Sequence, residues 1–426
     1  MGNMENSVKP HENKMGTMPM TRLILTMSLP AIFSMTIQAM YNVVDSIFIG
    51  NYDADGLTAT SLAYPLQMLL IAFAAGTAVG VNSFVSRKLG EKNFVQANDG
   101  ATHGIVTCIF NYVIFLLLGL FAVRPFMAMY TQNEAIVNYG IQYLTVVLCF
   151  SFFSIVQIMV EKTLQATGNM IAPMWFQIAG VVFNFVFDPL LIFGIGPFPK
   201  MGVVGAAVAT VLGYVVSTII ALIQLFLTKQ KVKPVFKNCL EPQMIKLIFS
   251  YGLPSFVMNA LGAFTVNFAN MFLVRYSDTA VAFFGAYFKV QQLIFMTVNG
   301  LIQGCLPIMR FNYRAKEYGR LKQANKSGTI IATVMMIVGM LLVLIFPKEI
   351  LFLFSASEEM CAFGVPAMRI MSLGFVFSGF SAMIATYEQA TDSIMPGVVV
   401  QLLRQGVLLV PVIWLLNSAV QMTGIW

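Results

Sequence analysis

The sequence predicts an all-α integral membrane protein, and three observations support this fold class. Of its 426 residues, 58% are hydrophobic and only 10% are charged, whereas a soluble domain carries about 25% charged residues. Apolar runs of roughly 20 residues, long enough to cross about 30 Å of hydrocarbon, recur along the whole chain. Motifs of the first half also return in the second half at one constant spacing. We therefore expect two membrane-embedded lobes of helices.

The order of the predicted elements follows from these apolar runs. A polar tail, 1–22, comes first and lacks the apolar core of a signal peptide. Because the apolar runs are long and do not alternate with polar residues, they are typical of helices and not of barrel strands. The eleven predicted spans are 23–49, 58–84, 101–123, 138–160, 170–194, 202–227, 250–274, 280–306, 328–346, 362–386 and 395–416.

The second half of the chain repeats the first at an offset of 224 residues, as from Leu29 to Leu253. The matching sets are Leu29-Pro30 with Leu253-Pro254, Gln67 with Gln291, Gly76 and Gly80 with Gly300 and Gly304, and Gln165-Ala166-Thr167 with Gln389-Ala390-Thr391. Six helices in each half would give both halves the same orientation in the membrane. We therefore expect two six-helix lobes related by a pseudo-two-fold axis along the membrane normal, which is a transporter architecture.

The repeat also defines the predicted domains. The N-terminal lobe covers 23–227, the basic segment 228–249 is a cytoplasmic linker, and the second lobe covers 250–426. The sixth span begins near Gly202, and its counterpart at an offset of 224 would begin at Trp426, where the sequence stops. We therefore expect the twelfth helix to be missing, and we favour a truncated sequence over a dispensable helix.

The distribution of positive charge predicts the orientation in the membrane. Most of the 25 lysines and arginines fall in loops on one side of the predicted spans. The other side carries only Arg124, Lys200, Arg275 and Lys348. Because the side rich in positive charge faces the cytoplasm, we expect a multi-pass protein of the plasma (inner) membrane with a cytoplasmic N-terminus. The net charge of +7 is thereby explained by orientation, and we expect no nucleic-acid partner.

Two acidic residues fall within predicted spans, Asp45 in the first and Asp188 in the fifth. A carboxylate at the bilayer centre costs about 3 kcal/mol on insertion scales, so such a residue should face protein or a water-filled cavity. Both spans run outward and place the aspartates at a similar depth, so the two could share one cavity. The alternative is that both are solvated residues at helix ends.

Polar residues at helical spacing accompany both aspartates. Gln177, Asn184 and Asp188 lie on one stripe of the fifth span, and Gln38 shares a face of the first span with Asp45. The candidate residues for a polar cavity are Gln38, Tyr41, Gln67, Gln177, Thr210 and Tyr214 in the first half, and Asn259, Lys289, Gln292 and Arg404 in the second. Two neighbouring carboxyl groups could share a proton, or could bind Na⁺ together with asparagine and threonine oxygens. These residue types are compatible with either ion, H⁺ or Na⁺.

Four segments carry a resemblance to a known family: MSLPAIFSMTIQAMYNVVDSIFIG, GVNSFVSRKLGEKN, LQATGNMIAPM and FNFVFDPLLIFG. Together they resemble the multidrug and toxic compound extrusion (MATE) family, in a bacterial branch with MepA-like and DinF-like features. The resemblance implies twelve helices in two lobes. It also implies efflux of drugs or organic cations in exchange for H⁺ or Na⁺, and a cation site at the positions of Asp45, Asn184, Asp188 and Thr210. The seventh span has no acidic residue, which argues against a second site used by other members.

The sequence therefore predicts a secondary active antiporter, and not an enzyme, with no cofactor beyond the coupling ion. Its expected partners are small amphipathic or cationic drugs and the lipid bilayer, and we expect a monomer. The alternative is a lipid-linked oligosaccharide flippase of the polysaccharide-export type. Lys289 and Arg404 favour that alternative because they could meet a pyrophosphate, whereas the number of spans disfavours it.

Overall fold

The structure, a computed structural model, describes residues 14–131, 133–228, 230–235, 241–273, 278–353 and 358–391, together with residues 399 and 403. Every regular element in these ranges is a helix. Eight helices are long and apolar enough to cross a membrane, or nine when one bent pair is counted as a single span. The predicted fold class, an all-α integral membrane protein, is confirmed.

The first half of the chain begins with the short helix α1 (Lys14–Thr17) and continues with helices that match the predicted spans. They are α2 (Met20–Tyr52), α3 (Ala54–Gly90), α4 (Phe94–Phe121), α5 (Val123–Ala128), α6 (Glu134–Cys149), α7 (Ser151–Ala166), α8 (Ile171–Phe193) and α9 (Val203–Leu227). The second half contains α10 (Pro242–Leu273), α11 (Asp278–Arg314), α12 (Tyr318–Ile345), α13 (Pro347–Leu353), α14 (Glu358–Ser372) and α15 (Gly374–Ala390). The predicted span 395–416 lies outside the described residues, so the total of eleven spans stays a prediction.

Two predicted spans each comprise two helices in the structure, and one of these pairs is strongly bent. The span predicted at 138–160 consists of α6 and α7, which meet at Phe150 with a bend of 48°. The span predicted at 362–386 consists of α14 and α15, which meet at Leu373. The two breaks fall at nearly equivalent places of the 224-residue repeat, so the interruption belongs to both halves.

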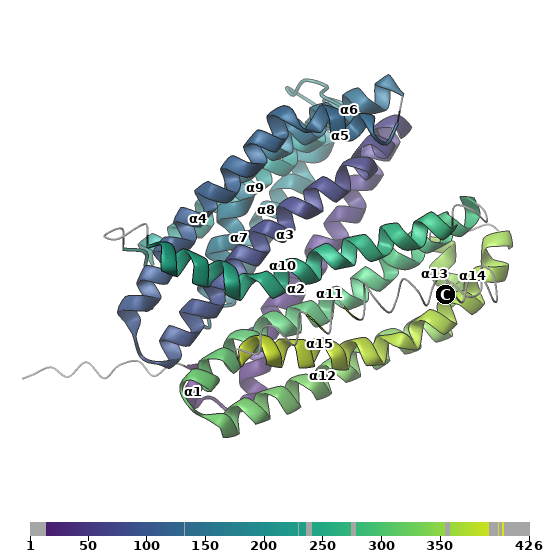
Figure 1. Ribbon diagram of the computed structural model, residues 1–426. Helices are drawn as coiled ribbons and strands as arrows, with labels where there is room; N and C mark the ends of the chain where they lie inside the picture. Colours follow the sequence, from purple (N-terminus) through teal and green to yellow (C-terminus); the bar gives the residue numbers. More distant parts are fainter. Residues whose placement is uncertain are drawn as a thin grey trace, which may run out of the picture.

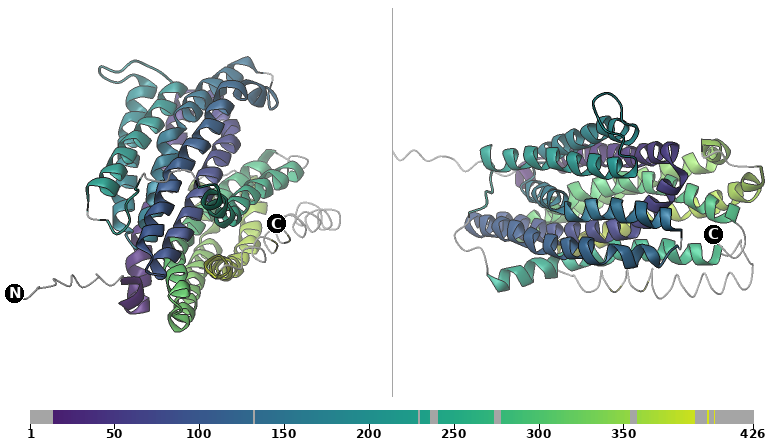
Figure 2. Two further views of the ribbon diagram at one scale, coloured as in Figure 1. Left: turned by 60° about the vertical axis from the view of Figure 1, so that its left-hand side comes forward. Right: turned by 90° about the horizontal axis from the view of Figure 1, so that it is seen from above.

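The helices form two bundles that meet at the end of the molecule where α1 lies and diverge toward the other end (Figure 1). We call the end with α1 the N-terminal end. Seen from above, the helices of both bundles run along one general direction, as a membrane crossing requires (Figure 2). One hydrophobic core lies among α3 to α9, and a second among α11 to α15. We call the helices around these two cores the first and the second bundle.

Helix α2 belongs to both cores. Its early residues Leu23, Ile24 and Met27 are buried in the second core, whereas Ile49 near its other end is buried in the first. Helix α10 starts in the opposite bundle in the same way, because Ile248 is buried in the first core. Thus α2 packs against α11, and α10 packs against α3.

Small residues permit these two crossings. A Cβ atom on Gly80 of α3 would overlap the carbonyl oxygen of Ile248 on α10, and one on Gly304 of α11 would overlap Ser28 on α2. Gly80 and Gly304 are partners in the 224-residue repeat, and Ser28 corresponds to Gly252, whose nitrogen lies 3.2 Å from the same Cβ position on Gly80. The two halves therefore cross by equivalent close approaches of their backbones.

The connection between the bundles is attached to the start of α4. The backbone N–H of Lys233 donates to Asn98 Oδ1 at 3.0 Å, and the N–H of Val235 donates to the Thr102 hydroxyl oxygen at 2.8 Å. The N–H of Glu241 donates to His103 Nε2 at 3.0 Å. Helix α10 then begins at Pro242, within the segment 228–249 that the sequence predicts to be a linker.

Candidate functional site

The two membrane aspartates face each other inside the first bundle. Asp45 lies on the half of α2 that packs in the first core, and Asp188 lies on α8, which packs against it. Their side chains are within interaction range of each other. Asp188 is fully buried at 0% exposure, and Asp45 is half-buried. The alternative expectation, that both are solvated helix-end residues, is therefore wrong for Asp188.

Thr210 of α9 connects the other predicted members of the site. Asn184 Nδ2 donates a hydrogen bond to Thr210 Oγ1 at 3.3 Å. The Tyr41 hydroxyl lies at 3.3 Å from the same oxygen. Tyr41 also lies within electrostatic range of Asp45 and Asp188. The structure thus brings together residues of α2, α8 and α9 at one place.

A close approach of α8 and α9 makes this contact possible. A Cβ on Gly180 of α8 would come within 2.8 Å of the carbonyl oxygen of Gly213 on α9, and a Cβ on Gly213 would come within 3.0 Å of the Asn184 Cβ. Because neither position has a side chain, the two helices lie close enough for Asn184 to reach Thr210.

The site contains oxygen atoms that the described part of the protein does not satisfy. They are Asp45 Oδ1, Asn184 Oδ1 and both carboxylate oxygens of Asp188, all buried and without a hydrogen bond of ordinary geometry. Burying unpaired carboxylate oxygens is costly unless a proton or a cation binds to them. Hard cations prefer carboxylate and carbonyl oxygens as ligands. The donor set therefore fits a bound proton or Na⁺.

The sequence did not identify Tyr143 of α6 as part of this site. Its side chain is 5% exposed, its hydroxyl oxygen accepts a hydrogen bond from Gln67 Nε2 at 3.1 Å, and it lies within electrostatic range of both aspartates. Gln67 was predicted as a cavity residue, and through Tyr143 it becomes a neighbour of the acidic pair. Tyr143 lies four residues after Tyr139 in its span, and this pair of tyrosines at helical spacing was the signal that could have found it.

The remaining cavity candidates lie on several helices of both halves. Gln38, Gln177 and Tyr214 are half-buried residues of α2, α8 and α9. In the second half, Gln292 of α11 is within hydrogen-bonding range of Tyr64 on α3, and Lys289 is exposed. The side chain of Asn259 and all of Arg404 lie outside the described residues. The role of each as a cavity residue stays a prediction.

Two bundles of membrane-spanning helices, with a buried cluster of oxygen donors inside one of them, define a multi-pass membrane transporter. The chain belongs to the MatE family, whose model matches residues 30–190 and 254–415. The two matched segments begin 224 residues apart, which agrees with the repeat in the sequence.

Two relatives are similar in sequence over nearly the whole chain. Multidrug export protein MepA of Staphylococcus aureus (strain MSSA476) is 25% identical over 410 residues, which are 96% of this chain and 89% of that protein. Multidrug export protein MepA of Staphylococcus haemolyticus (strain JCSC1435) is 25% identical over 406 residues, with 95% and 88% covered.

Solved structures share the fold. One is an outward-facing conformation of a multidrug resistance MATE family transporter of the MOP superfamily, with a TM-score of 0.91 at 23% identity, covering 98% of this chain and 93% of that one. Another is a MOP superfamily transporter from Pyrococcus furiosus Vc1 (DSM3638), with a TM-score of 0.92 at 22% identity and the same coverage. At these identities the likeness shows the fold.

Proposed function

We propose that this protein is a secondary active multidrug exporter, which moves small amphipathic or cationic drugs out of the cell in exchange for H⁺ or Na⁺. The carrying observation is the cluster of unsatisfied oxygens on Asp45, Asn184 and Asp188 inside the first bundle. The MatE family match and the MepA relatives, which are multidrug export proteins, support drug efflux. These relatives give no support to the lipid-linked oligosaccharide flippase.

The coupling ion binds between Asp45 and Asp188 in this proposal. Two carboxylates in contact repel each other, and burial disfavours their charged forms. A proton on one of them, or a Na⁺ ion held by both with Asn184 and Thr210, removes the repulsion. The ion therefore stabilises an arrangement of α2 against α8 that the empty pair does not favour. Differential stability of two states is what coupling requires.

The energy available from one ion is sufficient for useful concentration of a drug. One elementary charge moving inward across 100 mV releases about 2.3 kcal/mol. That free energy corresponds to about a fiftyfold gradient of an uncharged substrate. A chemical gradient of the ion adds to this amount.

Uptake by proteoliposomes tests the proposal directly. The purified protein is reconstituted, a fluorescent organic cation is supplied, and a proton gradient and a sodium gradient are imposed separately. We expect one of the two gradients to drive accumulation of the cation and its dissipation to stop transport. Equal accumulation with and without both gradients would show that the protein is not an ion-coupled exporter.

Neutral variants of the aspartates test the site. Asp45→Asn and Asp188→Asn keep the side-chain size and remove the negative charge, so we expect each to abolish gradient-driven efflux at normal expression. Asp55→Asn, in the first turn of α3, is the matched control and should transport normally. Drug resistance of cells that equals wild type in either Asp45→Asn or Asp188→Asn would contradict this assignment.

A further inference from the structure

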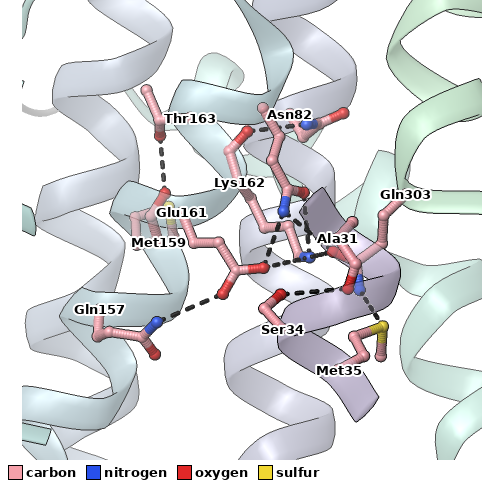
Figure 3. A network of polar contacts seen from close by, with 11 residues as sticks. Ala31, Ser34, Met35, Asn82, Gln157, Met159, Glu161, Lys162, Thr163 and Gln303 are labelled. Carbon is pink, nitrogen blue, oxygen red and sulfur yellow. Dashed lines mark hydrogen bonds and ion pairs between the residues drawn. The ribbon is translucent and has the colours of Figure 1, made fainter. Parts of the chain in front are cut away.

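A second polar cluster lies between the bundles, apart from the acidic pair. It is built around Lys162 near the end of α7 (Figure 3). Lys162, Glu161 and Gln165 are at most 9% exposed. Glu161 and Lys162 are charged residues near the end of a membrane-spanning helix, yet both side chains are buried and pair with each other at 2.8 Å.

All three donors of the Lys162 ammonium group have an acceptor. Lys162 Nζ lies 2.8 Å from Glu161 Oε1, 3.1 Å from Gln165 Oε1 and 2.7 Å from Gln303 Oε1. The first two acceptors belong to α7 itself, whereas Gln303 belongs to α11 of the second bundle. An ammonium group has three N–H donors, so the second bundle supplies the acceptor that completes the set.

Two further hydrogen bonds join the same elements. Gln165 Nε2 donates to Gln303 Oε1 at 3.0 Å. Asn82 of α3 donates to the backbone oxygen of Lys162 at 2.8 Å and accepts from Arg310 Nη1 at 2.9 Å. Gln303 and Arg310 are seven residues apart on α11 and therefore lie on one face of that helix. One face of α11 thus bonds to both α7 and α3.

Separation of the bundles at this end would leave the charge of Lys162 under-satisfied. The group is buried, and an unmade hydrogen bond to a buried charge costs more than an ordinary one. Glu161 neutralises Lys162 from the same helix and holds it toward Gln303. This arrangement favours contact between the bundles whenever water is excluded from the cluster.

We propose that Lys162 and Gln303, with Glu161 as the positioning residue, form a polar latch that holds the two bundles together at the N-terminal end of the molecule. The latch must open each time that end separates during transport. This inference rests on the proposed function only in treating the chain as a transporter that alternates between two states, and it depends on neither the ion nor the drug.

Two tyrosines lie between the latch and the acidic pair. Tyr214 of α9 lies within electrostatic range of Glu161, and Tyr143, beside Asp45 and Asp188, lies within range of Tyr214. The polar groups of the first bundle therefore form a series from the acidic pair to the latch. A rearrangement of α9 on ion binding would reach both.

Distances between spin labels test the latch in the full-length protein. In a background without native cysteines, labels at Val95→Cys and Tyr318→Cys report on the N-terminal end, because these exposed residues begin α4 and α12. Labels at Met129→Cys and Phe352→Cys report on the opposite end from exposed positions in both bundles. Each pair is measured in reconstituted protein by pulsed electron paramagnetic resonance, without drug and at fixed pH.

We expect Gln303→Ala and Lys162→Ala to increase the population separated at the N-terminal end by about tenfold, the effect of losing one hydrogen bond to a charged group. The opposite end should close correspondingly. Glu161→Gln should give a smaller shift in the same direction, and Lys162→Arg should keep most of the parent distribution. The double variant Lys162→Ala, Gln303→Ala should shift no further than the larger single effect, because the two residues share one contact.

Lys246→Ala is the matched control, since Lys246 is an exposed lysine of α10 that lies outside the latch. Its distance distributions should equal those of the parent. Gln303 is an uncharged, half-buried residue, so its variant should fold even if the Lys162 variant does not. Parent-like distances at both ends in Gln303→Ala would overturn the latch. That result would leave the ion-coupled efflux proposal standing, because uptake is measured separately.

Discussion

At the scale of single residues, Thr210 has the most connected position in the acidic site. Its hydroxyl oxygen accepts from Asn184 and contacts the Tyr41 hydroxyl. These contacts orient Asn184 so that its own oxygen stays free beside Asp188. Thr210 therefore prepares the donor set without carrying charge, and its loss should weaken ion binding more mildly than the loss of an aspartate.

This argument predicts a graded result for substitutions of Thr210. Thr210→Val keeps the shape and removes the hydroxyl, so we expect the ion concentration for half-maximal uptake to rise about fivefold, as for one net hydrogen bond of about 1 kcal/mol. Thr210→Ser keeps the hydroxyl and should behave like wild type. An unchanged ion dependence in Thr210→Val would show that the hydroxyl plays no part in ion binding.

Helical spacing predicted which residues lie near Asp188, but it did not predict the latch. Asn184 and Asp188 share a stripe on one helix, and their meeting with Asp45 requires only that α2 and α8 be neighbours. Glu161 and Lys162 are adjacent in the sequence, a spacing that does not by itself predict a side-chain contact on a helix, and charges near a helix end are usually solvated. The hydrogen bond from Lys162 to Gln303 could not be read from the sequence, because Gln303 lies in the other half of the chain and in no motif shared with Lys162.

At the scale of elements, the crossings of α2 with α11 and of α3 with α10 depend on glycine. We expect Gly80→Val and Gly304→Val each to destabilise the protein by about 1–3 kcal/mol, because the added side chain would overlap the backbone or side chain of the facing helix. The measurement is the midpoint of thermal unfolding in detergent. Gly319→Ala, at a position with open space, should leave the midpoint nearly unchanged, and a fall as large as that of Gly80→Val would contradict the packing argument.

Span prediction from apolar length identified the existing helices but not their breaks. Around Phe150 the apolar run continues from α6 into α7 without a proline or glycine, so a hydropathy pattern cannot show that the helix is interrupted. The bend of 48° therefore depends on how the helices pack and not on a residue that interrupts helices. Likewise α10 starts before its predicted span does, directly after Glu241, whose backbone N–H donates to His103 of α4.

At the scale of the whole molecule, the charge distribution predicts that the N-terminal end faces the cytoplasm. A single Val95→Cys variant should then react with a membrane-impermeant maleimide only after the cells are permeabilised. Met129→Cys, at the other end, should react in intact cells. The reverse pattern would place the N-terminus, and the latch at the same end, on the outer side of the membrane.

The two-fold character of the chain was readable from its sequence, since the offset of 224 residues recurs in the paired glycines and in the segments matched by the family model. The sequence did not show that the beginnings of α2 and α10 each pack in the core of the opposite bundle. A repeat records which segments are alike, but not which copy a segment packs against, and that choice is made by apolar contacts between distant residues.

The shared membership of α2 has one mechanical consequence. Its beginning is fixed in the second core by Leu23 and Ile24, while Asp45 sits near its far end inside the first. A tilt of one bundle relative to the other cannot leave α2 unmoved. When the bundles move relative to each other, α2 moves with both of them, and the Asp45 carboxylate shifts relative to Asp188.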